Sequence, residues 1–363
     1  MTKATLHRLS ADDQARALPL LEGRDHLLLL EAVIAGTAPG YVCVDDPSQP
    51  RALFASGPEG HYLVGDPGDG SFTSALAAHI QGELLPKARE QGWASFVLYH
   101  EPEWALAMEE LFPGQVLVRN CQRYFCHQSP LPDWRAALPQ GVTALPIDRD
   151  LLDRDDLGNI QWLRDFCEGD YASPDAFLAH GFGMCLVQEG EIVSWCTTDC
   201  VVGRRAEIGI TTASDHRRKG YGTAAAAATV EEARRRGITH VGWHCFQQNL
   251  ASAATALRAG FVEQYSHAVV SLWLNPVDGL LVNGNLALMA GDYAAAAELY
   301  RAGLALWAET RDVDKSAVLA ERAYQARYRY QAACAAALAG DAAMALDELE
   351  TAWAYGVMRQ AAV

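Results

Sequence analysis

Basic residues are scarce in this 363-residue chain, which has 29 lysines and arginines against 45 aspartates and glutamates and a formal net charge of −16. A general nucleic-acid binder must neutralise phosphates over a broad surface, so this balance argues against such a partner. An acidic surface fits a cationic small molecule, or simply keeps the protein in solution. The length indicates two or three domains.

Cysteine pairs with metal-ligand spacing are also missing. None of the nine cysteines forms a Cys-x-x-Cys pair, and the closest pairs, Cys121/Cys126 and Cys196/Cys200, have no histidines spaced for a zinc site. We therefore expect no metal ion. Scattered free thiols are typical of a reducing cytoplasm.

Long hydrophobic runs are absent as well. The run HLLLLEAVIAG, residues 26–36, is too short to span a bilayer. The first residues lack the basic and apolar regions of a signal peptide. The sequence therefore predicts a cytoplasmic protein without a membrane partner.

Strand and turn patterns divide the chain into three regions. Residues 1–130 mix short strands with helices, and the proline-rich residues 131–140 form a linker. Residues 141–275 are a second mixed region, in which 183–212 predict three antiparallel strands joined by Glu-Gly and Gly-Arg turns. Residues 277–363 predict helices alone.

Two helical predictions carry a detail that the structure can test. Residues 71–92 are helical in pattern but contain Pro86, which should kink or end the helix. Residues 150–167 predict a helix in the second mixed region.

Internal repeats occur at both ends of the chain. In the helical region, Gly291-Asp292 and Gly340-Asp341 each precede a small residue, Ala296 and Ala345, at the same offset. This resembles tetratricopeptide repeats, with an insertion over residues 309–320 in the second unit. The first mixed region also repeats the element order of the second, so we interpret it as a diverged copy of the same half-fold.

A basic cluster stands out in the stretch ASDHRRKGYGTAAAAATVEEARRRG, residues 213–237. Three consecutive basic residues precede a Gly-x-Gly loop, and an alanine-rich helix follows at once. A helix N-terminus offers unpaired N–H groups and partial positive charge, and glycine lets an anion approach the backbone closely. The pattern predicts a bound pyrophosphate.

Three ligand types compete for this loop. A P-loop NTPase needs its lysine after the glycines, whereas here the lysine precedes them. A dinucleotide fold could use residues 220–225 as Gly-x-Gly-x-x-Ala, but no carboxylate follows about 20 positions on, and the preceding strand belongs to an antiparallel meander. The third candidate is coenzyme A.

The motif Arg217-x-x-Gly220-x-Gly222, followed by Asn249-x-x-Ser252 and then Gly260-Phe261, resembles the GNAT superfamily of acyltransferases. The match is to a subgroup with an extra N-terminal domain and covers residues 1–275. It implies an α+β fold with a mixed, largely antiparallel sheet flanked by helices. A degenerate GNAT-like α/β domain would precede this fold, and an α-helical repeat domain would follow it.

The resemblance also implies acetyl-CoA as the cofactor. The backbone of the strand before the loop would pair with the pantetheine arm, the loop would cradle the pyrophosphate, and the next helix would flank the pantetheine. The residues so assigned are Ile210, Thr211, Thr212, Arg217, Arg218, Lys219, Gly220, Tyr221, Gly222, Thr223, Asn249 and Ser252. Asn249 is equally suited to cap its helix.

The corresponding loop of the first region, residues 64–72, carries Asp66 and Asp69 and no basic residue. Carboxylates repel a pyrophosphate. We therefore expect one cofactor site in each chain.

Catalytic residues are also implied by the resemblance. Glu207 would act as general base, although it is equally placed to pair with Arg204 or Arg205, and His244 would be a base or a structural residue. Many relatives place a tyrosine where this chain has Ala256, so the leaving thiolate would take its proton from water, Ser252 or Tyr265.

Three functions follow from these patterns. The first is an acetyl-CoA-dependent N-acetyltransferase that acts on the primary amine of a small molecule. The second is a protein acetyltransferase that binds its target through the helical repeats, which also suit self-association. The third is a non-catalytic acyl-CoA-binding sensor or scaffold, suggested by Ala256.

Overall fold

The computed structural model describes residues 6–68, 70–310, 319 and 322–355. The chain divides into two compact units. One comprises the described parts of Met1–Leu76, Tyr99–Ala107 and Cys121–Ala268, and the other those of Ala77–Leu98, Met108–Asn120 and Val269–Val363. Each unit is built from separate stretches of sequence, and the boundaries predicted at 130, 141 and 277 remain predictions.

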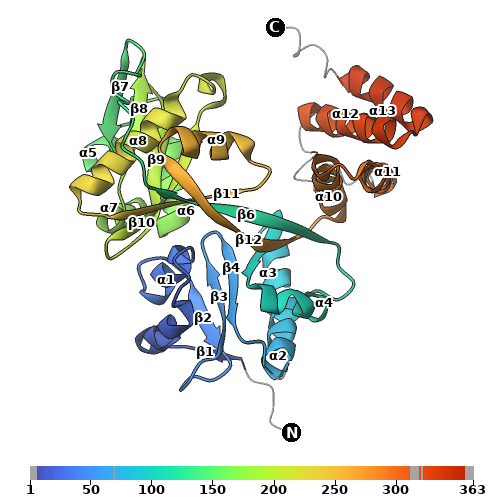
Figure 1. Cartoon of the computed structure of the whole chain (residues 1–363), viewed down its shortest axis with the longest axis horizontal. Helices are drawn as coiled ribbons and strands as arrows, with labels where there is room; N and C mark the ends of the chain where they lie inside the picture. Colours follow the sequence, from blue (N-terminus) through green and yellow to red (C-terminus); the bar gives the residue numbers. More distant parts are fainter. Residues whose placement is uncertain (1–5, 69, 311–318, 320–321, 356–363) are drawn as a thin grey trace. The chain divides into compact units, whose positions relative to one another are not determined.

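The strands of the described chain form one mixed sheet (Figure 1), and each lies at least partly in the first unit. Their order is β1-β2-β3-β4-β5-β12-β6-β11-β10-β9-β8-β7. Their bounds are β1 His7–Arg8, β2 Tyr41–Val44, β3 Ala52–Gly57, β4 Gly60–Gly65, β5 Ser95–His100, β6 Leu117–His127, β7 Val142–Pro146, β8 Gly183–Gln188, β9 Glu191–Val202, β10 Arg205–Thr212, β11 His240–Phe246 and β12 Phe261–Trp273.

The two halves of the sheet have the same strand order when each is followed from its outer edge toward the centre. One edge gives β1 to β5 and the other gives β7 to β11, each in chain order. The last strand of each half is exchanged, because β12 lies beside β5 and β6 lies beside β11. The sheet therefore has the internal repeat that the sequence predicts, and each half completes the other.

Helices lie between some of these strands, and four more, α10 to α13, follow the last strand. Their bounds are α1 Leu28–Ile34, α2 Ser71–His79, α3 Leu85–Glu90, α4 Met108–Leu111, α5 Arg149–Leu152, α6 Ile160–Tyr171, α7 Pro174–His180, α8 Tyr221–Arg235, α9 Leu250–Arg258, α10 Pro276–Ala290, α11 Tyr293–Thr310, α12 Arg322–Ala339 and α13 Ala342–Tyr355. Short 3₁₀ segments cover Ala11–Leu21, Pro102–Ala107 and Ser214–His216.

The predicted meander over residues 183–212 is confirmed as β8, β9 and β10, all antiparallel. Its first turn holds Glu189 and Gly190, both with positive φ, as a two-residue hairpin turn requires. The helix α8 packs on β8, β9 and β10 (Figure 1), and its five consecutive alanines, Ala224 to Ala228, are all buried. Small side chains let the helix lie close to the sheet, which fixes where its N-terminus meets the strands.

The two helical details have different outcomes. Pro86 does not end its helix, because a π-helical turn at Ile80–Leu84 connects α2 to α3. Proline has no N–H to donate to the preceding turn, and the wider π-helical turn accommodates this missing hydrogen bond. The continuous helix predicted over 150–167 is wrong: it breaks into α5 and α6, because Asn159 has a left-handed φ of 65° and Gly158 forms a bridge with Glu191.

The C-terminal helices of the second unit pack as successive pairs, α10 with α11 and α12 with α13. Gly291 and Gly340 have left-handed φ values of 82° and 84° and separate the helices of each pair. Ala296 is fully buried in the shared core with Tyr300. These hairpins match the predicted helical region, and their assignment as tetratricopeptide repeats remains a prediction. Most of the predicted insertion, 311–318 and 320, lies outside the described residues.

All nine cysteines are free thiols. Among the described helices, none is long and apolar enough to cross a membrane. The described residues also contain no group of three or more histidine, cysteine, aspartate or glutamate side chains arranged to bind a metal ion.

Candidate active site

The N-terminus of α8 has the backbone geometry of an anion site. Gly220 precedes the helix with φ of 85°, and Arg218, two residues earlier, also has positive φ. The first backbone bond of the helix runs from Ala224 N–H to the Gly220 carbonyl at 3.1 Å. The N–H groups of residues 221–223 precede this bond and have no helical carbonyl to donate to. They are available for an anion.

Gly222 has a different role from Gly220. A Cβ at this position would lie 3.3 Å from Ile210 Cδ1 and 3.3 Å from Thr212 Oγ1. Glycine therefore lets the first turn of α8 approach the end of β10 closely.

A groove of about 860 Å³ opens at this junction. It contains all the residues predicted to bind the cofactor except Lys219, which is exposed and does not line it. The sequence prediction missed six further lining residues: Ser214, His216, Ala251, Ala254, Thr255 and Arg258. Arg258 adds a cation that no motif indicated, because it reaches the groove from the far end of α9.

The strands β10 and β11 separate along this groove. They pair in parallel only from Arg205/His240 to Glu207/Gly242. Beyond this point, β10 pairs with β9 alone and β11 with β6 alone, and the register of β10 shifts at Glu207/Ile208. The facing edges of the two strands therefore carry main-chain groups that an amide-containing ligand can pair with, as an added strand would.

Asn249 and Ser252 lie at the start of α9, on one side of the groove. The Asn249 side chain accepts a hydrogen bond from Ser252 N–H at 3.1 Å, so Asn249 caps the helix. The Ser252 hydroxyl accepts from Trp243 Nε1 at 3.0 Å. Trp243 packs in the core with α8 and α9, on the opposite face of β11 from His244.

Glu207 and His244 meet across the paired ends of β10 and β11. Their carboxylate Oε1 and imidazole Nδ1 are in contact, and both side chains are buried. The alternative partners of Glu207 are engaged elsewhere: Arg205 binds Glu31 of α1 at 2.5 Å, and Arg204 donates to the Gly237 carbonyl. The structure thus brings two of the predicted catalytic residues together and places Ser252 on the other face of the sheet.

The free nitrogen of the imidazole is oriented by this pair. With Nδ1 held by Glu207, His244 Nε2 is buried and has no partner among the described residues. A carboxylate that holds one ring nitrogen fixes the tautomer and stabilises the protonated ring. This arrangement can accept a proton at Nε2.

Two aromatic side chains that the sequence prediction did not assign lie beside the His244 ring. Tyr124 of β6 lies 4.7 Å from the His244 ring, centroid to centroid, and its hydroxyl contacts His240 Nε2 at 2.8 Å. Burial and a neighbouring thiol raise the pKa of Tyr124, so it stays a neutral phenol. His267 of β12 lies 5.3 Å from His244. No motif identifies these residues, because they come from strands exchanged between the halves.

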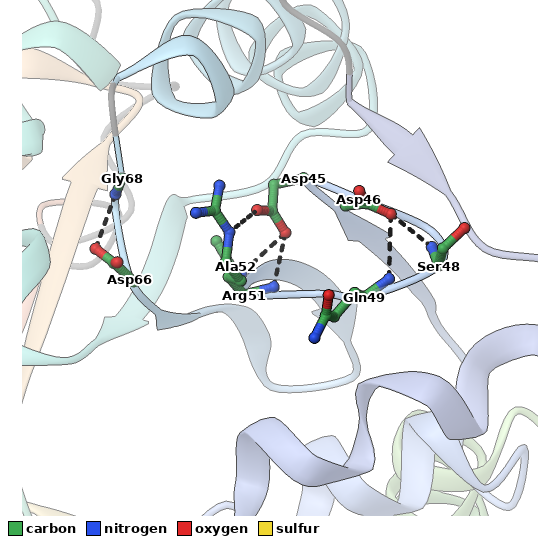
Figure 2. Close-up of polar contacts among 8 residues, drawn as sticks. All are labelled: Asp45, Asp46, Ser48, Gln49, Arg51, Ala52, Asp66 and Gly68. Carbon is green, nitrogen blue, oxygen red and sulfur yellow. Dashed lines mark hydrogen bonds and ion pairs between the residues drawn. The ribbon is translucent and has the colours of Figure 1, made fainter.

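At the corresponding strand end in the first half of the sheet, described residues of the chain bind the main-chain groups. Its strand β4 ends at Gly65, whose N–H donates to Glu101 Oε2 at 2.8 Å and whose carbonyl accepts from Trp104 Nε1 at 2.8 Å. Figure 2 shows the carboxylate of Asp66 bound to Gly68 N–H, and Asp45 and Asp46 bound in the same way in the turn after β2. Groups of the chain itself therefore take up the hydrogen-bonding groups of Gly65 at the end of β4. Asp69, the other predicted carboxylate, lies outside the described residues.

Known proteins share the fold and the sequence pattern. The sequence model of the family described as GNAT acetyltransferase matches residues 18–270. The chain is 24% identical over 232 residues to the uncharacterized N-acetyltransferase YdfB of Bacillus subtilis (strain 168), covering 63% of this chain and 84% of that protein.

Two solved structures show the same fold. A GCN5-related N-acetyltransferase-like protein from Streptococcus suis 89/1591 aligns with a TM-score of 0.54 and 20% identity, over 72% of this chain and 99% of that one. A Drosophila protein aligns with a TM-score of 0.50 and 12% identity, over 74% of this chain and 99% of that one.

Proposed function

The chain belongs to the GNAT acetyltransferase family and is an N-acyltransferase, and from this premise we propose that it transfers an acetyl group from acetyl-CoA to the primary amine of a small molecule. In this reaction a nitrogen–carbon bond forms, the carbon–sulfur bond breaks, and the proton lost by the amine nitrogen is balanced by the proton that the leaving thiolate takes up. The observation that carries the proposal is the buried Glu207–His244 pair where the paired part of β10 and β11 ends, next to a groove suited to coenzyme A.

The lining of the groove supports acetyl-CoA as its ligand. The N–H groups of residues 221–223, with Arg217 and Arg218, suit a pyrophosphate. The unpaired edge of Ile210 to Thr212 suits the amides of the pantetheine arm, with Asn249 on the opposite side. When bound, acetyl-CoA supplies an acyl carbon activated as a thioester.

The catalytic base in this proposal is His244, held by Glu207. The amine gives its proton to His244 Nε2, and the Glu207 carboxylate stabilises the charged ring. This assigns Glu207 an assisting role, since its Oε1 already contacts Nδ1. Proton transfer of this kind contributes about 10²- to 10⁴-fold to a rate.

The leaving sulfur needs a proton from another group. Ala256 is fully buried and has no proton to donate. We assign the role to the Ser252 hydroxyl, because it lines the groove and accepts a hydrogen bond from Trp243 Nε1, so that the serine proton points away from the indole. The serine oxygen regains its proton from solvent, and His244 returns the amine proton to solvent.

The proposal is tested at the loop before α8. Gly220→Asp adds a side chain and a negative charge at a residue with positive φ, so we expect acetyl-CoA affinity to fall at least about 100-fold in calorimetry. Gly237→Asp is the matched control, because Gly237 has φ of 81° and open space around it at the other end of α8.

Wild-type protein should release thiol from acetyl-CoA in the presence of a panel of primary amines. Equal affinity of the Gly220→Asp variant and the wild type would show that the groove does not bind acetyl-CoA. Absence of turnover with every amine, together with absence of acetyl-CoA binding, would end the proposal.

A further inference from the structure

A second, smaller pocket lies on the side of the active site contributed by the first half of the sheet. Its volume is about 250 Å³. It is formed by the ends of β4 and β5, by the middle of β12 and by the segment before α1. Its lining includes His26, Leu63, Tyr99, Glu101, Tyr265 and His267.

One layer of side chains separates this pocket from the Glu207–His244 pair. A cavity of about 10 Å³, enough for a single water molecule, lies beside Glu207 and His244. His26, Leu27, Tyr99 and His267 line both this cavity and the larger pocket. The rings of His244 and His267 are 5.3 Å apart, and those of His267 and His26 are 4.9 Å apart.

Three imidazole nitrogens in this layer have no hydrogen-bond partner among the described residues. They are His26 Nδ1, His244 Nε2 and His267 Nε2, and all three are buried. A buried polar atom without a partner costs about 1–3 kcal/mol, so a cluster of them indicates a place for a polar ligand or an internal water. All three residues line the small cavity.

The charged residues that line both cavities have one sign, and Arg24, which is outside the lining, pairs with Glu101. Glu59, Glu101 and Glu207 line them, and none of the described lining residues is a lysine or arginine. Burial and the neighbouring His244 lower the pKa of His26 to about 4, and the same two causes lower the pKa of His267. Both histidines are therefore uncharged at neutral pH. The walls attract an ammonium group and repel a carboxylate or phosphate.

We propose that the 250 Å³ pocket binds the acyl acceptor, and that this acceptor is a compact primary amine without a carboxylate or phosphate group. The inference rests on the proposed function, since the amine in the pocket would pass its proton to His244 Nε2 through the water-sized cavity that both sites adjoin. The pocket is below the usual 300–1,000 Å³ of drug-sized sites, which selects a small molecule. Leu27, Leu63 and Val64 suit an apolar body, and the histidine nitrogens suit its polar groups. The first half of the sheet thus serves the acceptor instead of a second cofactor.

The preference for an acceptor without a carboxylate is tested with amines that differ in one group. The full chain is assayed for thiol release from acetyl-CoA with tyramine, tyrosinamide and tyrosine, and with cadaverine, lysinamide and lysine. We expect kcat/KM to be at least about tenfold higher for the amine and the amide than for the amino acid in one set or both. The amides separate the effect of charge from that of size.

Equal or faster turnover of the amino acids would overturn this inference and leave the proposed function standing. Turnover of none of the six compounds would also overturn it. Loss of acetyl-CoA binding as well would show that the proposed function had failed first.

The location of the acceptor site is tested with two variants on β12. Tyr265→Ala opens the pocket wall, and we expect the KM of the amine to rise at least fivefold while the Kd of acetyl-CoA is unchanged. Val262→Ala is the matched control, since Val262 is equally exposed on the same strand and lies outside the pocket. An unchanged KM for Tyr265→Ala would place the acceptor elsewhere.

Discussion

The role of Glu207 depends on which partners its neighbouring residues bind. By sequence, Glu207 had three candidate uses, and two of them involved Arg204 and Arg205. In the structure those arginines bind Gly237 and Glu31, so Glu207 is left to His244. The alternation of side chains along paired strands brings the two to the same face, because Glu207 lies opposite Gly242 and His244 is two residues further.

A Glu207→Gln variant tests this pair. Glutamine keeps the shape and a hydrogen-bond acceptor but cannot stabilise a charged imidazole, so we expect kcat to fall about 100-fold with the Kd of acetyl-CoA unchanged. Steady-state thiol release at saturating amine measures it. Glu31→Gln, which removes a carboxylate on the same face, should keep wild-type activity. A wild-type kcat in Glu207→Gln would mean that the pair takes no part in proton transfer.

At the scale of secondary-structure elements, the divergence of β10 from β11 decides where a ligand can bind. The strands before and after the loop were predictable from alternation and turn residues, and the pairing of the first of them with the pantetheine arm was an expectation from the family resemblance. The corresponding end of β4 in the first half of the sheet differs in its hydrogen bonds. Glu101 and Trp104 bind the main-chain N–H and carbonyl of Gly65 at the end of β4. Neither residue is part of the loop sequence that follows β4, so the loop sequence alone does not predict these bonds.

Asn249 is placed to act both as a helix cap and as a cofactor contact, and substitution separates the two. Asn249→Ser keeps a capping oxygen, so we expect the free energy of unfolding to change by less than about 0.5 kcal/mol. The loss of the amide should weaken acetyl-CoA binding about tenfold. Asn249→Ala should lose about 1 kcal/mol of stability as well. Urea unfolding and calorimetry measure both quantities, and wild-type affinity in the serine variant would leave Asn249 as a cap alone.

At the scale of the whole molecule, the exchange of β6 and β12 makes the active site a product of both halves. Tyr124 and His267 come from the exchanged strands, and His26 precedes α1. The buried histidines also tie the stability of the fold to pH. Burial, with His244 nearby, holds the pKa of His26 at about 4, well below the ordinary value near 6.5.

The sign of this pH dependence follows from linkage. Above pH 6.5, His26 is neutral in both states and contributes no pH dependence. Between pH 6.5 and about 4 the unfolded chain binds a proton that the folded chain does not, so stability falls as pH falls. From pH 7.5 to 5.0 the loss assigned to His26 is about 2 kcal/mol.

Urea unfolding of the wild type and of His26→Gln at pH 7.5 and 5.0 measures this loss. The variant should lose about 2 kcal/mol less than the wild type over this range. His180→Gln, at an exposed histidine, is the control and should follow the wild type. An identical pH dependence in all three proteins would contradict a neutral buried His26.

The sequence by itself determined the loop at the N-terminus of α8, the meander before it and the helices at the end of the chain. These features depend on residues close together in sequence: glycines with positive φ, turn pairs, and a run of alanines in one helix. It also carried the family resemblance, since the motif residues keep a fixed spacing. Its one clear error, the unbroken helix over 150–167, came from a left-handed Asn159 that propensity does not reveal.

Only the tertiary structure decided how the active site is assembled. The contact of Glu207 with His244, the layer of His26 and His267, and the closing of the β4 edge join residues up to about 240 positions apart. Such contacts arise from strand order and from the exchange of β6 and β12. Neither leaves a local pattern, because a strand's partner is set by the packing of the whole sheet and not by its own residues.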